Sequence, residues 1–244
     1  MWVIPSNMLE DPSVRTPSPA MLELRALRYQ AATAAEPVLR DVSLRLEAGK
    51  PALVAGRSGS GKTTLLELIC GLADPGGGQI LWNGEPLNGR QRRWLCGLVF
   101  QFPERHFLGL TVGQELKLGQ RRLPWETAER VLGQVGLQGL SLQQAPERLS
   151  GGQQRRLALA VQLLRDPRVL LLDEPTAGLD WSVRDEVLEL LERLSRDRVV
   201  LVVTHEPELF AGWLDPACSW RLLHGRLQPL AAEHSAALAA DRRR

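Results

Sequence analysis

One nine-residue segment, GRSGSGKTT at 56–64, limits this chain to few folds. It follows the pattern glycine, four residues, Gly-Lys-Thr, with an apolar run before it and a helical pattern after it, which is the setting in which such a loop binds phosphate. The glycines let backbone amides approach the phosphates, Lys62 can reach the β- and γ-phosphates, and Thr63 can offer its hydroxyl to Mg²⁺. We therefore expect a nucleoside triphosphate and Mg²⁺ to be bound by Gly56, Arg57, Ser58, Gly59, Ser60, Gly61, Lys62, Thr63 and Thr64.

The rest of the chain contains short apolar runs and segments with a helical pattern. Apolar runs occupy 52–55, 97–100, 169–172 and 199–203, and such runs suit strands buried on both faces of a parallel sheet. Three further segments repeat apolar residues at i, i+3, i+4 and i+7, which predicts helices with one buried face. The predicted buried faces consist of Leu65, Leu68, Ile69 and Leu72, then Leu157, Ala160, Val161 and Leu164, then Val187, Leu190, Leu191 and Leu194.

Each predicted strand ends in a glycine or a polar residue. Because open parallel sheets bind ligands beyond the carboxyl ends of their strands, we expect these residues to converge on one site. There Asp173 would hold Mg²⁺ through water, and Glu174 would orient or deprotonate the attacking water. Two adjacent carboxylates favour hydrolysis over binding alone. The residues expected to converge are Gly56, Gln101, Asp173, Glu174, Thr204 and His205.

A second glycine-rich segment, LSGGQQRRLALA at 149–160, offers no nucleophile, general base or tightly held metal ligand. Its Ser-Gly-Gly opens directly onto a helical pattern, and unpaired amides at a helix N-terminus attract phosphate oxygens. The phosphate loop at 56–64 already provides a binding site for a nucleotide. Spacing leaves three interpretations open: the second site is redundant, it binds another ligand, or it is directed at the nucleotide of another chain.

Taken together, these segments resemble the ABC ATPases, whose signature LSGGQ stands at 149–153. The resemblance runs from about residue 22 to 228 and includes, in the family's order, the phosphate loop, Gln101, LLLDEP at 170–175, AGLD at 177–180 and THE at 204–206. It implies an α/β, P-loop NTPase fold of the ABC ATPase type. That fold has a mainly parallel core sheet, an antiparallel β subdomain and an inserted helical subdomain. The ATP-binding domain is expected at 21–230 and its helical subdomain at about 102–166.

The resemblance also implies a partner. In this family two domains pair head to tail, so that each ATP lies between the phosphate loop of one subunit and the signature of the other. The signature residues Ser150, Gly151, Gly152 and Gln153 would thus act on the partner's nucleotide. Ser150 and Gly152 would touch its γ-phosphate, and the helix from Gln153 would contribute its dipole.

Four further residues receive roles from the same resemblance. Gln101 would contact Mg²⁺ and the attacking water, and His205 would bond the γ-phosphate. Asp180 would lie at the dimer seam, where it links the two sites. Tyr29, the only tyrosine, follows the first apolar segment, where the family carries an aromatic side chain that stacks on adenine.

Charge and cysteine content exclude several classes of protein. The net charge of +2, from 30 basic and 28 acidic residues, gives no footprint for nucleic acid, and no nucleic-acid partner is expected. Cys70, Cys96 and Cys218 are odd in number and form no close Cys or His pair, so we expect neither a zinc site nor a disulfide framework and assume a reducing cytosol. The apolar runs are too short to span a bilayer. Residues 1–20 are predicted to be a flexible leader, with Met21 as a possible start, and 231–244 a C-terminal tail.

The segment QFPERHFLGLTVGQELKLG at 101–119 is similar to the energy-coupling factor branch, the ATPases of bacterial vitamin and metal-ion importers. The segment THEPEL at 204–209 also suits that branch. This implies a peripheral subunit on the cytoplasmic face of the membrane that dimerises on ATP with an identical or related chain and powers micronutrient import. The segment after Gln101 would contact the transmembrane subunit, with Phe102, Pro103, Glu104 and Phe107 near a groove that grips its helix.

Two alternative functions remain open. The chain could be a soluble ABC ATPase without a membrane partner, of the kind that helps to assemble iron–sulfur clusters. It could also be an ATP-dependent scaffold with little turnover, although Glu174 and His205 weigh against that reading.

Overall fold

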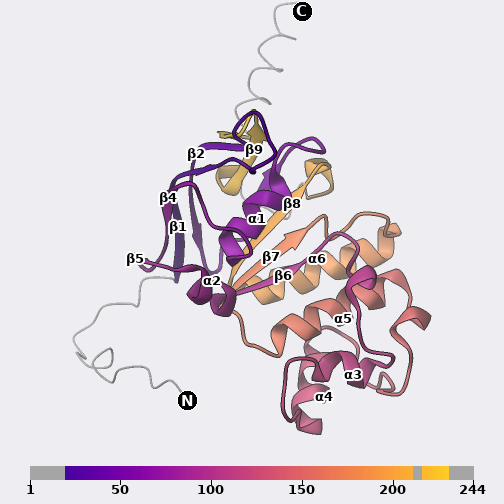
Figure 1. Cartoon of the computed structure of the whole chain (residues 1–244). Coiled ribbons are helices and arrows are strands. Elements are labelled where there is room, and N and C mark those ends of the chain that lie inside the picture. The colour runs from indigo at the N-terminus through magenta and orange to yellow at the C-terminus, as the bar shows by residue number, and fades with distance from the viewer. Residues whose placement is uncertain (1–19, 211–215, 231–244) are drawn as a thin grey trace, which may run out of the picture.

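The computed structural model describes residues 20–210 and 216–230, drawn in colour in Figure 1. The expected leader and C-terminal tail therefore lie outside the described residues, apart from Ala20. The strands are β1 (Met21–Tyr29), β2 (Leu39–Glu47), β3 (Ala52–Ala55), β4 (Gly77–Trp82), β5 (Glu85–Pro86), β6 (Cys96–Val99), β7 (Val169–Asp173), β8 (Val199–Thr204), β9 (Ser219–Leu223) and β10 (Arg226–Pro229). The α-helices are α1 (Lys62–Cys70), α2 (Gly89–Leu95), α3 (Val112–Lys117), α4 (Trp125–Gln134), α5 (Gly151–Leu163) and α6 (Trp181–Ser195). Short 3₁₀ turns occupy η2 (Pro103–His106), η3 (Pro146–Arg148), η4 (Pro207–Phe210) and η5 (Pro216–Cys218).

The larger sheet has the strand order β10-β9-β3-β8-β7-β6, and every neighbouring pair is parallel except β10 with β9. The four apolar runs predicted as buried strands are confirmed to within one residue as β3, β6, β7 and β8. Ala55 pairs with Thr204 at the end of two strands, and Asp173 pairs with Val203. These strands therefore end side by side, which brings the residues that follow them to one edge of the sheet.

Each face of this sheet has its own hydrophobic core. Alternate residues of a strand point to opposite faces, so Leu53 packs with the helices α5 and α6, whereas its neighbour Val54 packs with α1 and the smaller sheet. The smaller sheet is antiparallel and has the order β2-β1-β4-β5. Figure 1 shows α1 between the two sheets and α5 and α6 on the opposite side of the larger one. The predicted α/β architecture, antiparallel sheet included, is confirmed.

The helix after the phosphate loop is shorter than its apolar pattern predicts. Leu65, Leu68 and Ile69 are fully buried, but Leu72 is 59% exposed, so its prediction as a buried residue is wrong. The cause is Gly71, which caps α1 in the left-handed conformation at φ +78° and turns the chain away before Leu72. Apolar spacing cannot show where the backbone leaves the helix.

The segment between β6 and β7 contains α3, α4 and α5. Figure 1 shows α3 and α4 beyond α5, on the side remote from the antiparallel sheet. Their buried residues join the core of α5 and α6 without a break; Leu116 of α3 and Val131 of α4 are both fully buried there. These helices therefore rest on α5, which itself packs on the sheet. In the described part of the chain, no helix has both the length and the apolar character that a membrane crossing requires.

Candidate active site

The phosphate loop joins β3 to α1 and contains two glycines in the left-handed backbone region. Gly59 and Gly61 have φ of +76° and +100°, a region that side chains rarely adopt. A Cβ on Gly61 would also lie 2.9 Å from Cγ1 of Val38. The first turn of α1 carries no side-chain cap and no acidic residue, so its amides are available to an anion. The loop therefore fits the phosphates of a nucleotide.

Lys62 is buried and lies against the loop itself. Its Nζ donates to the carbonyl of Gly56 at 2.7 Å and to that of Arg57 at 3.3 Å. The carboxylate oxygen Oε1 of Glu174 lies 3.6 Å away. The only buried lysine among the described residues thus stands between the loop and a catalytic candidate from β7.

Asp173 and Thr63 form the part of the site that suits magnesium. The Thr63 hydroxyl donates to Oδ2 of Asp173 at 2.6 Å, across a sequence separation of 110 residues. One hydroxyl and one carboxylate are hard oxygen ligands, and Mg²⁺ completes such sets with water and substrate phosphates. No group of three or more His, Cys, Asp or Glu side chains within 20–210 and 216–230 could hold a metal ion without such help. The residues fit Mg²⁺ that arrives with a nucleotide.

Burial raises the pKa of Asp173, and the nearby negative charge of Glu174 adds to this, while the bond from Thr63 and the charge of Lys62 act in the opposite direction. The ionised carboxylate is therefore costly in the folded protein until a cation neutralises it. The carboxylate that suits Mg²⁺ binding therefore lowers the stability of the ligand-free protein.

Glu174 is held by several groups at the ends of β7 and β8. Its Oε2 accepts from the Thr204 hydroxyl at 2.9 Å and from the His205 amide at 3.2 Å, and its Oε1 lies 2.8 Å from Nδ1 of His205. The backbone of Glu174 is left-handed, with φ +48°, which is strained for a residue with a side chain. This conformation turns the carboxylate out of the strand and toward Lys62.

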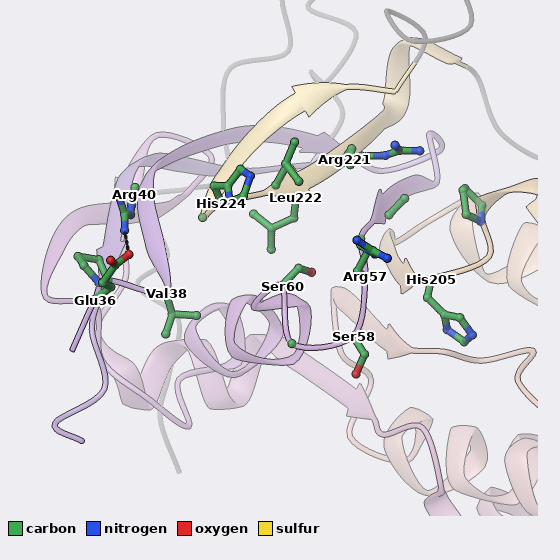
Figure 2. A pocket seen from close by; sticks show the side chains of 17 residues that line it. Glu36, Val38, Arg40, Arg57, Ser58, Ser60, His205, Arg221, Leu222 and His224 are labelled. Atoms are coloured by element: carbon green, nitrogen blue, oxygen red, sulfur yellow. Dashed lines mark hydrogen bonds and ion pairs between the residues drawn. The ribbon is translucent and has the colours of Figure 1, made fainter. Parts of the chain in front are cut away.

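Two adjoining cavities border the phosphate loop. The smaller, of about 580 Å³, is lined by Lys62, Thr63, Thr64, Gln101, Asp173, Glu174 and His205, among others. Of the six strand-end residues predicted to converge, Gln101, Asp173, Glu174 and His205 line this cavity. Gly56 lines the larger cavity, and Thr204 lines neither but donates its hydroxyl to Glu174. Figure 2 shows the larger cavity, of about 780 Å³, with Arg57, Ser58 and His205 at one side and Glu36, Val38 and Arg40 at the other. Both volumes fall in the range of small-molecule sites.

Several predicted residues line neither cavity. Tyr29 is half-buried at the end of β1, packed against the core around α1, and its carbonyl accepts from the amide of Val38. Asp180 is exposed at the start of α6. The signature residues lie elsewhere again, at the start of α5. Stacking on adenine by Tyr29 and a seam at Asp180 stay predictions.

The signature forms a well-built helix start. Ser150 Oγ accepts from the Gln153 amide at 3.3 Å, and the Gln153 side chain accepts from the Ser150 amide at 2.9 Å, which makes a reciprocal capping box. Ser150 and Gly151 are exposed, whereas Gly152 is buried. A Cβ on Gly152 would lie 2.3 Å from Cγ1 of Val183 in α6, so only glycine lets the two helices meet here.

One residue of this site escaped the sequence reasoning. Arg155 is buried, and its guanidinium donates to the carbonyls of Glu174 and Gln101. A signal was available: Arg155 stands at the spacing of the buried residues Gly152, Leu159 and Leu163 on the inner face of α5. An arginine in that position needs polar partners from another segment.

Replacing Asp173 by Asn should raise the midpoint of thermal unfolding of the ligand-free protein at neutral pH. A raised pKa means that the folded state binds a proton more readily than the unfolded chain does. Wild-type stability therefore falls as the pH rises above the unfolded value, about 3.9, through the folded pKa, and then stays lower. The Asn variant escapes this loss because it has no proton to release.

Thermal unfolding across pH measures the effect. The difference between the variant and the wild type should be absent below about pH 3.9 and complete at neutral pH, while Mg²⁺-dependent ATP hydrolysis by the variant is lost. The exposed Asp185→Asn substitution is the control and should change neither the thermal unfolding midpoint nor the rate of ATP hydrolysis at any pH. A less stable Asp173→Asn protein at neutral pH would mean that the bond from Thr63 outweighs the cost of burial.

Both the sequence and the fold of this chain are similar to those of known proteins. The family described as "ABC transporter" matches residues 39–177. The Arabidopsis thaliana protein named ABC transporter I family member 11, chloroplastic, is 37% identical, over 84% of this chain and 78% of its own length. The Symbiobacterium thermophilum protein named energy-coupling factor transporter ATP-binding protein EcfA2 is 38% identical, over 81% of this chain and 73% of its own length. The structure of CbiO1 from Clostridium perfringens, described as part of the ABC transporter complex cbiONQ, superposes with a TM-score of 0.77 at 26% identity, over 92% of this chain and 94% of CbiO1.

Proposed function

Because the chain belongs to the ABC transporter family and is an ATPase, we propose that it powers a membrane importer for a micronutrient, a vitamin or metal ion. The observation that carries this most is the convergence of Lys62, Thr63, Asp173 and Glu174 on one cavity beside the phosphate loop. Similarity to energy-coupling factor ATP-binding proteins and to CbiO1 supports the importer branch. We also propose that the chain acts at the cytoplasmic face of the membrane as a peripheral subunit.

Within this site we assign roles by geometry and charge. Thr63 and Asp173 would hold Mg²⁺ together with Gln101, and the ion would neutralise the charge of the phosphates. Glu174 would accept a proton from the attacking water or orient it, since its carboxylate faces the same cavity as Lys62. His205, at the same cavity, would donate to the γ-phosphate.

We propose that the exposed signature acts on the ATP of a second, identical or related chain. Ser150 and Gly151 are exposed and lie outside both cavities that border their own chain's phosphate loop. The capping box joins Ser150 to Gln153 at the start of α5. A two-fold pairing would use the same contacts twice and would bury both nucleotides. Asp180, exposed at the start of α6, would lie at the seam of that pair.

The loop before α3 is the surface that we assign to the membrane partner. Leu108 is 79% exposed and Leu110 is 80% exposed. The loop that carries them is firmly held, because the buried Glu115 side chain accepts from the amides of Leu108 and Gly109 at 2.8 and 2.7 Å. Two leucines presented to solvent on a rigid loop are typical of a protein contact.

The four residues expected near this contact differ in exposure. Pro103 is buried and Phe107 is half-buried against the core of α5, whereas Glu104 is exposed. Phe102 is exposed and stacks with the guanidinium of Arg105 at 4.6 Å. The exposed leucines lie further along the same segment, and the contact itself stays a proposal. We propose further that 102–166 moves as one unit within the domain at 21–230 when ATP binds.

Capture from native membranes tests the importer proposal. A tagged Glu174→Gln protein loaded with ATP should co-purify with a transmembrane protein, and the same protein with Leu108→Glu and Leu110→Glu should lose at least about 90% of it. Charge on these two side chains removes the apolar contact but leaves the bonds of the loop backbone in place. Leu72→Glu, at a leucine beyond α1 that is 59% exposed, is the control and should retain the partner.

Two results would contradict the proposal. Recovery of soluble assembly factors alone would favour an ATPase without a membrane partner. Undiminished capture by the Leu108→Glu and Leu110→Glu protein would move the contact to another surface.

A further inference from the structure

Arg155 is a buried cation whose partners are all backbone carbonyls. It is 8% exposed, and within 20–210 and 216–230 its guanidinium donates to Glu174 O at 3.3 Å, Gln101 O at 3.5 Å, and the carbonyls of Pro175 and Ala177. Burial lowers the pKa of Arg155, and only the charge of Glu104 opposes this. A buried charge without a bonded carboxylate is costly to fold around. Hydrophobic packing alone does not explain an arginine at this position.

The four carbonyls belong to two segments that meet at the nucleotide cavity. Glu174, Pro175 and Ala177 form the turn that leaves β7 and leads toward the predicted seam. The carbonyl of Glu174 belongs to the strained residue with φ +48°. A donor on that carbonyl helps to hold the peptide plane, and thereby the direction of the side chain, in this sparsely populated conformation. Gln101 is the residue that follows β6 and lines the same cavity.

Arg155 itself belongs to neither segment. It stands on α5, five positions after Ser150, on the helix that begins with the signature. The start of α5 cannot shift on α6 without consequence, because Gly152 meets Val183 with no room for a Cβ. A displacement of the signature therefore reaches Arg155 through a rigid helix and a tight helix contact.

We propose that Arg155 is a positioning residue that transmits engagement of the signature by a partner's nucleotide to Glu174 of the same chain. The residue lines neither cavity beside the phosphate loop, so it acts through the turn after β7. Closure of the pair moves α5, and the guanidinium carries the carbonyls of Glu174 and Gln101 with it. Glu174 then reaches its working position only when the signature is occupied. This inference rests on the proposed pairing of two chains.

Arg155→Met tests this role, since methionine keeps most of the length and removes the donors. The variant should bind ATP within about twofold of the wild type, hydrolyse it at least tenfold more slowly with an unchanged KM, and accumulate the ATP-bound pair that the wild type forms only transiently. Arg155→Lys, which keeps the charge but cannot reach carbonyls on both segments, should recover less than half of the lost rate. Hydrolysis, equilibrium ATP binding and size-exclusion chromatography with ATP provide the three readouts.

The matched control is Arg92→Met. Arg92 is also buried and donates to a backbone carbonyl, that of Leu68, but at the end of α1 remote from the phosphate loop. The Arg92→Met variant should lose stability without accumulating the ATP-bound pair.

Equal losses of rate in the two methionine variants, or a loss of ATP binding by Arg155→Met, would reduce Arg155 to a structural residue and overturn the inference. If the wild type and Glu174→Gln never pair with ATP, the proposed function fails instead, and that result is visible before any Arg155 variant is made.

Discussion

Glu174→Gln should lower the rate of ATP hydrolysis at least about 100-fold, the typical contribution of a positioned general base or water-orienting group, while ATP binding stays within about threefold. Glutamine keeps the size of the side chain and can still accept from the Thr204 hydroxyl and the His205 amide. It removes the negative charge that faces Lys62 at 3.6 Å and His205 Nδ1 at 2.8 Å. The chemical step is lost and the fold is retained, so the ATP-bound pair should accumulate.

Phosphate release under saturating ATP, together with size-exclusion chromatography, measures both effects. Glu206→Gln is the matched control because Glu206 is a nearby acid, 3.7 Å from Nε2 of His205, that lines neither cavity. Its rate should remain within about twofold of the wild type. A Glu174→Gln protein that keeps more than about a tenth of the wild-type rate would show that another group, with Gln101 or His205 the nearest candidates, orients the water.

Ser150→Arg should abolish pairing and hydrolysis, with a rate at least about 100-fold below the wild type, as expected when the contacts that complete a site are absent. Binding of ATP to the single chain should remain within about twofold. Ser150 is exposed and remote from its own chain's cavities, so a bulky side chain there leaves the phosphate loop untouched. Loss of the cap costs about 1 kcal/mol, which a domain of this size tolerates. Ser141→Arg, at another exposed serine whose hydroxyl accepts a backbone amide, is the control and should pair normally.

Mixing two inactive proteins decides whether the signature acts in trans. A pair of one Ser150→Arg chain with one Glu174→Gln chain contains one composite site with an intact carboxylate and an intact signature. Part of the wild-type hydrolysis should therefore return on mixing. No recovery at any ratio, in chains shown to associate, would mean that Ser150 serves the nucleotide of its own chain. Weakened ATP binding by isolated Ser150→Arg would lead to the same conclusion.

Local features of this protein were readable from its sequence because local rules govern them. The phosphate loop needs glycine wherever φ is positive, as at Gly59 and Gly61, and the lysine that follows is set by the same loop. Apolar runs of strand length located β3, β6, β7 and β8, since strands buried on both faces have nowhere to place polar residues. The family motifs then predicted the antiparallel sheet, which no periodicity had indicated.

Spacing along the sequence did not predict which residues are exposed, and Leu72 is the error that resulted. Leu72 fits the apolar repeat of α1 but lies beyond the glycine that ends the helix. Pro103 is buried, while Leu108 and Leu110 stand in solvent, because the bonds of Glu115 to the loop amides decide which way that loop faces. Neither a helix end nor a loop direction has a period that sequence can display.

The sequence by itself determined the class of fold, the phosphate loop, the adjacent carboxylates and the signature, since each of these depends on neighbours within a few residues. Only the tertiary structure decided that Thr63 bonds Asp173, that Gly152 meets Val183, and that Arg155 ties the signature helix to the backbone of Glu174. These contacts join segments separated by 19 to 110 residues. They depend on how the helices pack on the two faces of the sheet, and packing is a property of the whole chain.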